Sequence, residues 1–146
     1  MLHTPFRSRA ECPRNGRQIT PAPLCHAEVF GPFRPGLTAL EGFSHLILLY
    51  WLDPSGPPAL LFTPPFDTGP RGVFATRSPA RPNPIGLSVV AFEGIAPDGR
   101  LCVRYLDCID GTKLLDIKPY LPSTDAEPAA SLGWLARHRT GRMEPP

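Results

Sequence analysis

The sequence lacks the motifs that mark the common nucleotide-binding and hydrolytic enzymes. It contains no Gly-x-Gly-x-x-Gly after a strand-like run, no Walker-type Gly-Lys-Ser, no Gly-x-Ser-x-Gly and no His-Glu-x-x-His. These absences argue against a Rossmann dinucleotide site, a P-loop enzyme, a serine hydrolase of the nucleophile-elbow type and a zinc protease. The histidines are scattered: His3, His26, His45 and His138. We interpret His45, which lies within an apolar run, as a core or rim residue.

The sequence has four cysteines, and no two of them have the spacing of a metal-binding pair. Cys12, Cys25, Cys102 and Cys108 form no Cys-x-x-Cys, which is the close spacing that zinc sites use. The first twenty residues carry no apolar run behind a basic start, so we expect no secretory signal. We therefore expect free thiols in a reducing cytoplasm, and no metal. The longest apolar run, 46–52, is too short to span a membrane.

Lysine is almost absent, and arginine supplies most of the 15 basic residues. The net charge of +2 does not by itself indicate a nucleic-acid-binding protein. A guanidinium can pair with carboxylates and phosphates or stack on a base, which an ammonium group does not do. Two explanations stay open for the arginines. They are an ordinary solvated protein surface, rich in arginine because the genome is GC-rich, or they are contacts for an anionic or purine ligand. They form three clusters: Arg7, Arg9, Arg14 and Arg17; Arg71, Arg77 and Arg81; and Arg137, Arg139 and Arg142.

Proline is the residue in greatest excess. There are 21 prolines in 146 residues, against an average usage of about 5%. A hydrophobic content of 42% argues against disorder, since the chain has apolar surface to bury. The length suits one domain with its own core. We therefore expect a single folded, loop-rich domain over 1–146.

The pattern of apolar residues and turn signals predicts a mainly β protein, a small β-barrel or sandwich with short connecting and C-terminal helices. Residues 54–70 form a proline- and glycine-rich loop. A helix is expected over about 127–139. The expected strands are 27–33, at an edge; 43–52, buried on both faces; 72–76; 86–96 and 100–107, joined as a hairpin by Pro97-Asp98-Gly99; and 113–122, ended by Pro119.

The stretch 75–88, ATRSPARPNPIGLS, is both stiff and polar. Its prolines fix their own φ and hold the preceding residues extended, so ordering the loop on a ligand costs little entropy. Gly86 lets a ligand approach the backbone. The alternative, a rigid connection whose prolines block strand addition, explains the prolines but not the density of donors. The donors that suit an anionic or purine ligand are Arg77, Ser78, Arg81 and Asn83.

A second polar stretch, 105–122, carries three carboxylates within ten residues: Asp107, Asp110 and Asp116. Taken alone, Asp110-Gly111 is most simply a turn. Combined with the arginine-rich loop, the carboxylates make a bipolar site that suits a zwitterion.

Four motifs together resemble the TrmO family, also called TsaA-like proteins. They are CPRNG (12–16), LEGFSHLILLYW (40–51), GVFATRSPARPNPIGLSVV (72–90) and LDCIDGTKLLDIKPYLP (106–122), and the resemblance covers about 8–125. Members of this family are β-barrels of six or seven strands that bind S-adenosylmethionine without a Rossmann domain and form homodimers. They N6-methylate the threonylcarbamoyl-adenosine next to the anticodon of certain tRNAs. The resemblance therefore implies a cytoplasmic, dimeric methyltransferase with S-adenosylmethionine as cofactor and tRNA as partner.

By this similarity, the cofactor site uses residues from several motifs: Arg14, Asn15, Asp53, Arg77, Arg81, the backbone near Leu87, Tyr105, Leu106, Asp107 and Asp110. In-line positioning supplies much of the acceleration of a methyl transfer, so we name no general base. Asn83 is a candidate for orienting the acceptor amine. Longer family members carry a second, C-terminal domain that helps to hold tRNA, whereas this sequence ends at Pro146. Two alternatives stay open: methylation of a small molecule, and a non-catalytic barrel that binds nucleotide or RNA.

Overall fold

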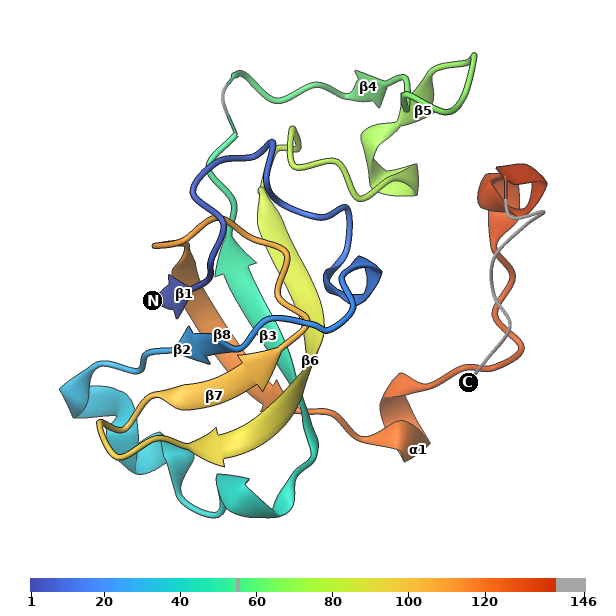
Figure 1. The fold of residues 1–146 in the computed structure, drawn as a ribbon. Helices are drawn as coiled ribbons and strands as arrows, with labels where there is room; N and C mark the ends of the chain where they lie inside the picture. The colour runs from blue at the N-terminus through green and yellow to red at the C-terminus, as the bar shows by residue number, and fades with distance from the viewer. Residues whose placement is uncertain (55, 139–146) are drawn as a thin grey trace.

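The computed structural model describes residues 1–54 and 56–138. Within them, six strands form one antiparallel sheet in the order β1-β2-β7-β6-β3-β8 (Figure 1). A separate pair joins β4 (Leu61–Phe62) to β5 (Arg71–Gly72). The mainly β class predicted from the sequence is confirmed. The strands of the large sheet are β1 (Leu2–His3), β2 (Cys25–Ala27), β3 (His45–Trp51), β6 (Ile85–Ile95), β7 (Leu101–Arg104) and β8 (Lys113–Pro119).

The two edges of the curled sheet meet at Leu2 and Thr112. The Leu2 amide donates to the Thr112 carbonyl at 2.8 Å, and the Gly111 amide donates to the Leu2 carbonyl at 2.9 Å. Thr112 directly precedes β8, so these bonds link the first strand of the sheet to its last. The link is an isolated bridge and not a ladder. The sheet is therefore not closed by strand pairing, and the predicted barrel is not confirmed.

Strand β3 buries one face only. Leu46, Leu48 and Tyr50 are 0%, 0% and 2% exposed, whereas Trp51 is 39% exposed. Alternate burial is the pattern of an antiparallel strand that packs one face on the core. The prediction of a strand buried on both faces is therefore wrong. The core inside the curled sheet is built from Leu2, Cys25, Ala27, Leu40, Leu46, Leu48, Tyr50, Val90, Phe92, Leu101, Val103, Leu106 and Cys108.

The predicted hairpin is confirmed as β6 and β7, joined by a turn at Pro97-Asp98-Gly99. Gly99 has a φ of 85°, which favours glycine, and its amide donates to the Ala96 carbonyl at 2.8 Å. The strand predicted over 113–122 is confirmed as the shorter β8.

Two other expected strands are wrong. Residues 27–33 do not form an edge strand, because β2 ends at Ala27 and lies between β1 and β7, and a 3-10 helix follows at Gly31–Leu37. Pro32 and Pro35 cannot donate to a sheet but are compatible with that tight helix. In the 72–76 segment only Gly72 belongs to a strand, as the last residue of β5, and Val73–Ala75 form a 3-10 helix.

The helix predicted over 127–139 is also largely wrong. A single helical turn, α1, spans Pro122–Asp125, and a 3-10 helix spans Gly133–His138, while 126–132 are not helical. Position 139 lies outside the described residues. This segment leaves the sheet and returns beside β5 (Figure 1). Among the described residues, no helix has the length and hydropathy needed to cross a lipid bilayer.

Candidate functional site

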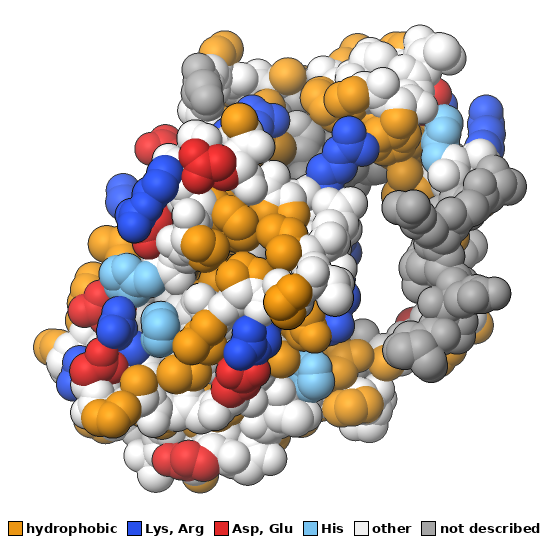
Figure 2. Space-filling model, viewed as in Figure 1, with side chains coloured by type: hydrophobic (Ala, Val, Ile, Leu, Met, Phe, Trp, Pro, Cys, Tyr) orange, Lys and Arg blue, Asp and Glu red, His pale blue; other side chains and the backbone are white. Residues whose placement is uncertain are grey.

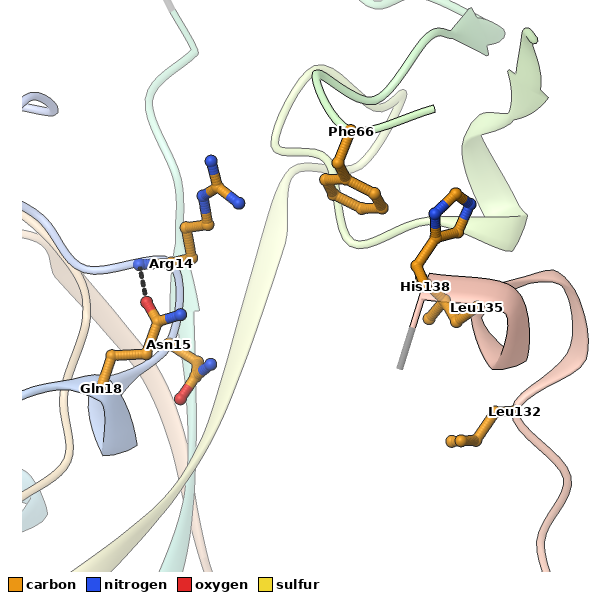
Figure 3. A pocket seen from close by; sticks show the side chains of 7 residues that line it. All are labelled: Arg14, Asn15, Gln18, Phe66, Leu132, Leu135 and His138. Carbon is orange, nitrogen blue, oxygen red and sulfur yellow. Dashed lines mark hydrogen bonds between the residues drawn. The ribbon is translucent and has the colours of Figure 1, made fainter. Parts of the chain in front are cut away.

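An open pocket of about 560 Å³ separates the N-terminal loop from the C-terminal segment (Figure 3). Small-molecule sites have volumes of roughly 300–1,000 Å³. One side of this pocket is polar and carries a guanidinium, and the other side is apolar and aromatic. The pocket therefore suits a ligand with an anionic group at one end and a flat apolar group at the other. Its lining residues are Arg14, Asn15, Gln18, Phe66, Leu132, Leu135 and His138.

The polar side of the pocket is a loop held by its own side chains. Asn15 caps the 3-10 helix Gly16–Gln18, and its Oδ1 accepts from the Arg17 amide at 3.0 Å. Gln18 Oε1 accepts from the Arg14 amide at 2.8 Å. Both bonds use backbone donors, so the Arg14 guanidinium is left to extend into the pocket (Figure 3).

This loop docks closely on the segment that follows β7. A Cβ atom at Gly16 would lie 1.8 Å from the Tyr105 carbonyl oxygen, so only glycine permits the approach. Tyr105 has a φ of 76°, and the Arg17 guanidinium lies 4.4 Å from the centre of its ring. The structure thus docks the loop that contains the predicted residues Arg14 and Asn15 on Tyr105, through contacts made by Gly16 and Arg17.

The next carboxylate, Asp107, accepts hydrogen bonds from two strands. The Tyr50 hydroxyl on β3 donates to Asp107 Oδ1 at 2.7 Å, and Ser88 Oγ on β6 lies 3.3 Å from the same atom. Tyr50 and Ser88 are also 2.9 Å apart. A Cβ at Gly86 would lie 2.2 Å from the Tyr50 ring, so this glycine makes room for the ring. Among the described residues, Oδ2 of Asp107 accepts no hydrogen bond, and the residue is partly buried.

Burial and the charge of Asp107 act on two neighbouring groups, the Tyr50 hydroxyl and the Cys12 thiol. Burial, followed by the negative charge of Asp107, raises the pKa of Tyr50. The hydroxyl therefore stays protonated at neutral pH and remains a donor. Burial and the Asp107 charge also raise the pKa of the Cys12 thiol. Cys12 begins the CPRNG motif, so its coupling to Asp107 agrees with the docking of the loop.

Sequence reasoning missed Tyr50 and Ser88. Both are polar side chains on the core face of strands, where Tyr50 is 2% and Ser88 is 7% exposed. A hydroxyl at such a position needs a partner. That requirement is the signal that could have linked these two residues to a carboxylate elsewhere in the chain.

Three other predicted residues, Asp53, Asn83 and Leu87, lie near the start of β6 and are exposed. Asp53 is exposed and follows β3, and the neighbouring Leu52 amide donates to the Pro84 carbonyl at 2.7 Å. This bond places Asp53 beside the start of β6, near Asn83, which is also exposed. Leu87 is paired with Leu49, is 48% exposed, and points to the face opposite Ser88.

The two arginines of the stiff loop differ in their contacts. Arg81 is half-buried and donates to the carbonyls of Val73, Thr76 and Ser78 at 2.9, 2.6 and 3.0 Å. Its guanidinium therefore fastens the loop. Arg77 is exposed, and among the described residues nothing hydrogen-bonds its guanidinium. Of the two, Arg77 is the one free to bind a ligand.

Asp110 belongs to a different group of contacts. Its Oδ1 accepts from the Thr4 amide at 3.1 Å, its Oδ2 pairs with Arg7, and His3 Nδ1 lies 3.8 Å away. The carboxylate therefore fastens the N-terminal strand, and the structure does not connect it to the Tyr50 cluster. Leu106, 1% exposed, contributes to the core through its side chain. In the described part of the chain, no three His, Cys, Asp or Glu side chains gather as a metal site would require.

Residues 1–126 match the family model described as the tRNA-methyltransferase O N-terminal domain. The chain belongs to the TrmO family. It is 44% identical over 135 residues, or 92% of its length, to a protein of Archaeoglobus fulgidus named as a probable S-adenosyl-L-methionine-binding protein. It is 42% identical over 86% of its length to a shorter protein of the same organism named as an S-adenosyl-L-methionine-binding protein, of which it covers 88%.

A second group of TrmO relatives is matched in part. Over 67 residues, 44% of the chain, it is 55% identical to a protein of Eikenella corrodens named as a tRNA (adenine(37)-N6)-methyltransferase, of which it covers 38%. The crystal structure of TrmO from Pseudomonas aeruginosa matches 90% of the chain at 38% identity with a TM-score of 0.73. The chain spans 58% of that structure and 36% of the longer Archaeoglobus relative.

Proposed function

We propose that this TrmO-family chain is an S-adenosylmethionine-dependent methyltransferase that acts on an adenine amine of tRNA. The observation that carries the proposal is the docking of the CPRNG loop on the Tyr105–Asp107 segment. In that contact the loop whose Arg14 guanidinium extends into the pocket packs against the segment that carries Asp107, a carboxylate outside the pocket lining. The relatives named for S-adenosylmethionine support the identity of the ligand.

The donor set fits this cofactor. The Arg14 guanidinium suits its carboxylate, and Oδ2 of Asp107 suits its ammonium group or its ribose hydroxyls. Phe66 and the leucines of the pocket suit the flat adenine. When bound, S-adenosylmethionine supplies an electrophilic methyl group on a sulfonium.

The residues of the chain act by binding and orientation. The Tyr50 hydroxyl holds Asp107 in one orientation, and the bonds from Arg81 hold the loop that carries Arg77. Positioning of this kind is the main contribution that a methyl transfer requires. Asn83 stays the candidate for orienting the acceptor amine, because it is exposed at the start of β6 beside Asp53.

The proposal also includes a homodimer and a cytoplasmic location. Trp51, Ile85 and Leu87 are 39%, 44% and 48% exposed, and the pairings Trp51–Ile85 and Leu49–Leu87 place them together on the outer face of the sheet. A contiguous exposed apolar face of this kind suits a homodimer contact. A tRNA substrate would place the protein in the cytoplasm.

The strongest alternative is a small-molecule acceptor. Acidic and basic side chains are interspersed on the face drawn in Figure 2, which therefore has no continuous basic surface for tRNA. Incubation with methyl-labelled S-adenosylmethionine, total tRNA and a metabolite extract separates the candidates. Label in tRNA supports the proposal, label in a metabolite supports the alternative, and binding without transfer supports a non-catalytic barrel.

A further inference from the structure

The C-terminal segment Leu132–His138 lies beyond the family match, which ends at 126, yet it is firmly anchored. Trp134 Nε1 donates to the Ala75 carbonyl at 2.8 Å. The Trp134 ring stacks on Phe66, with centroids 6.1 Å apart and planes 10° apart. The Arg71 guanidinium lies 5.1 Å from the centre of the Trp134 ring. These contacts fix the segment against the β4–β5 unit.

A carboxylate strengthens the same anchor. Asp67 has a side chain only 8% exposed, and it pairs with Arg71 at 2.7 Å and with His138 Nε2 at 3.7 Å. His138 also packs edge-on against Phe66, with centroids 5.4 Å apart. Both ends of the 3-10 helix Gly133–His138 are therefore tied down, and the helix is held in one orientation.

That orientation turns apolar side chains toward the pocket. Leu132 is 42% and Leu135 is 38% exposed, and both line the pocket with His138, across from Arg14 (Figure 3). Exposed leucines that share a concave site with aromatic rings mark a place where an apolar group binds. The opposite side carries positive charge, so the two sides fit the two ends of one ligand.

We propose that Leu132–His138 forms the apolar wall of the ligand pocket, where it binds the base of a purine nucleoside whose anionic group pairs with Arg14. This inference rests on the proposed function and deepens it, because it assigns a binding role to residues outside the matched domain. The nucleoside is either the cofactor or the acceptor adenosine, since both combine a purine with a charged substituent.

The first experiment measures binding in the full-length chain by calorimetry. The probe is S-adenosylhomocysteine, the demethylated cofactor, and the variant is L132S/L135S. We expect at least a tenfold loss of affinity, because two apolar contacts with the base are removed. L115S is the matched control, since Leu115 is 50% exposed on β8 and away from the pocket residues. Its affinity should equal that of the wild type.

A second experiment measures the fluorescence of Trp134, the residue that anchors the segment. The chain has two tryptophans, so W51F leaves Trp134 as the single reporter. Saturating S-adenosylhomocysteine should change the emission of Trp134, because the ligand covers the segment that Trp134 anchors. An unchanged emission, together with unchanged S-adenosylhomocysteine affinity of L132S/L135S, rules out the cofactor as the nucleoside that the wall binds.

The arms of the test separate the two sources of the nucleoside. Loss of S-adenosylhomocysteine affinity in L132S/L135S assigns the wall to the cofactor. Unchanged affinity with a raised KM for tRNA assigns it to the acceptor, and no effect on either overturns it. If the wild type fails to bind S-adenosylhomocysteine, the proposed function fails, and adenosine 5′-monophosphate becomes the probe for the wall. Absence of binding to that nucleotide, or equal binding by L132S/L135S, then overturns the wall as well.

Discussion

The Tyr50 hydroxyl donates to Oδ1 of Asp107 at 2.7 Å and so joins β3 to the segment after β7. Y50F should destabilise the fold by about 1–3 kcal/mol, because a partly buried carboxylate oxygen loses its better donor. It should also weaken S-adenosylhomocysteine binding, since Asp107 is no longer held in one orientation. Urea unfolding and calorimetry measure the two effects.

A matched control for Y50F is available on the other side of the sheet. Tyr120 packs edge-on against His45 through its ring, with centroids 6.3 Å apart. In the described part of the structure its hydroxyl makes no hydrogen bond. Y120F should therefore change the free energy of unfolding by less than about 0.5 kcal/mol. Equal effects of the two variants would contradict the role given to the Tyr50 hydroxyl.

Alkaline pH should destabilise the protein. Burial raises the pKa of Cys25 to about 11 and that of Cys108 to about 12, from an ordinary value of 9.0. Above pH 9 the unfolded thiols lose protons that the folded thiols keep, so the free energy of unfolding decreases as pH rises. Each thiol contributes a slope of at most about 1.4 kcal/mol per pH unit until its folded pKa is reached.

Urea titrations at intervals between pH 8 and pH 11 measure this slope. C25A should reduce the slope at every point above pH 9, even though the variant is less stable throughout because of its cavity. Cys102, which is partly exposed on β7, provides the control as C102A. A free energy of unfolding that stays constant across this range would contradict the assignment.

Much of the fold was predictable because strand pairing leaves local signals. Turn residues at Pro97-Asp98-Gly99 and valine-rich runs identified the β6–β7 hairpin, and Pro119 marked the end of β8. Strand β1 was missed, because two residues carry no period and pair only through distant partners such as Ala27. The 3-10 helices also escaped prediction, since proline-rich segments fit both extended and tightly turned backbone.

The residues of the candidate site were predictable only where they lie within a sequence motif of the family. The CPRNG loop and the Tyr105–Asp107 segment came from the family resemblance, and the structure places them in contact through Gly16. Asp110 resembled a ligand-binding carboxylate by its spacing, but its contacts are to Arg7 and Thr4, which are distant in sequence. Leu135 and its neighbours were expected to form a long helix. Their position at the pocket depends on the contacts of Trp134 with Phe66 and Ala75, which lie far away in the sequence, so no local pattern predicts it.

The two arginines of the stiff loop should respond differently to substitution. R77A should weaken S-adenosylhomocysteine binding by about 1.5–3 kcal/mol, the range for hydrogen bonds to charged groups, with stability unchanged. R81A should lower the melting temperature, because three backbone carbonyls lose their donor. R100A is the control, since Arg100 is an exposed partner of Asp98. Binding by R77A equal to that of R100A would refute a ligand role for Arg77.

Gly16 should not tolerate a methyl group. A Cβ at this position would lie 1.8 Å from the carbonyl oxygen and 2.2 Å from the carbonyl carbon of Tyr105, and neither backbone atom can move away as a flexible side chain would. G16A should therefore displace the loop that carries Arg14 and cost about 1–3 kcal/mol of stability, the usual penalty for overpacking.

The displaced loop should also lose its ligand contacts. S-adenosylhomocysteine affinity should fall in G16A even under conditions where the variant is fully folded. The reason is that the guanidinium of Arg14 no longer faces Phe66 across the pocket. G42A is the matched control, since a Cβ at Gly42 would meet nothing within 4 Å. Calorimetry well below the melting temperature of both variants compares folded proteins only. If G16A then binds as tightly as G42A, the loop is not part of the ligand site and the docking on Tyr105 is purely structural.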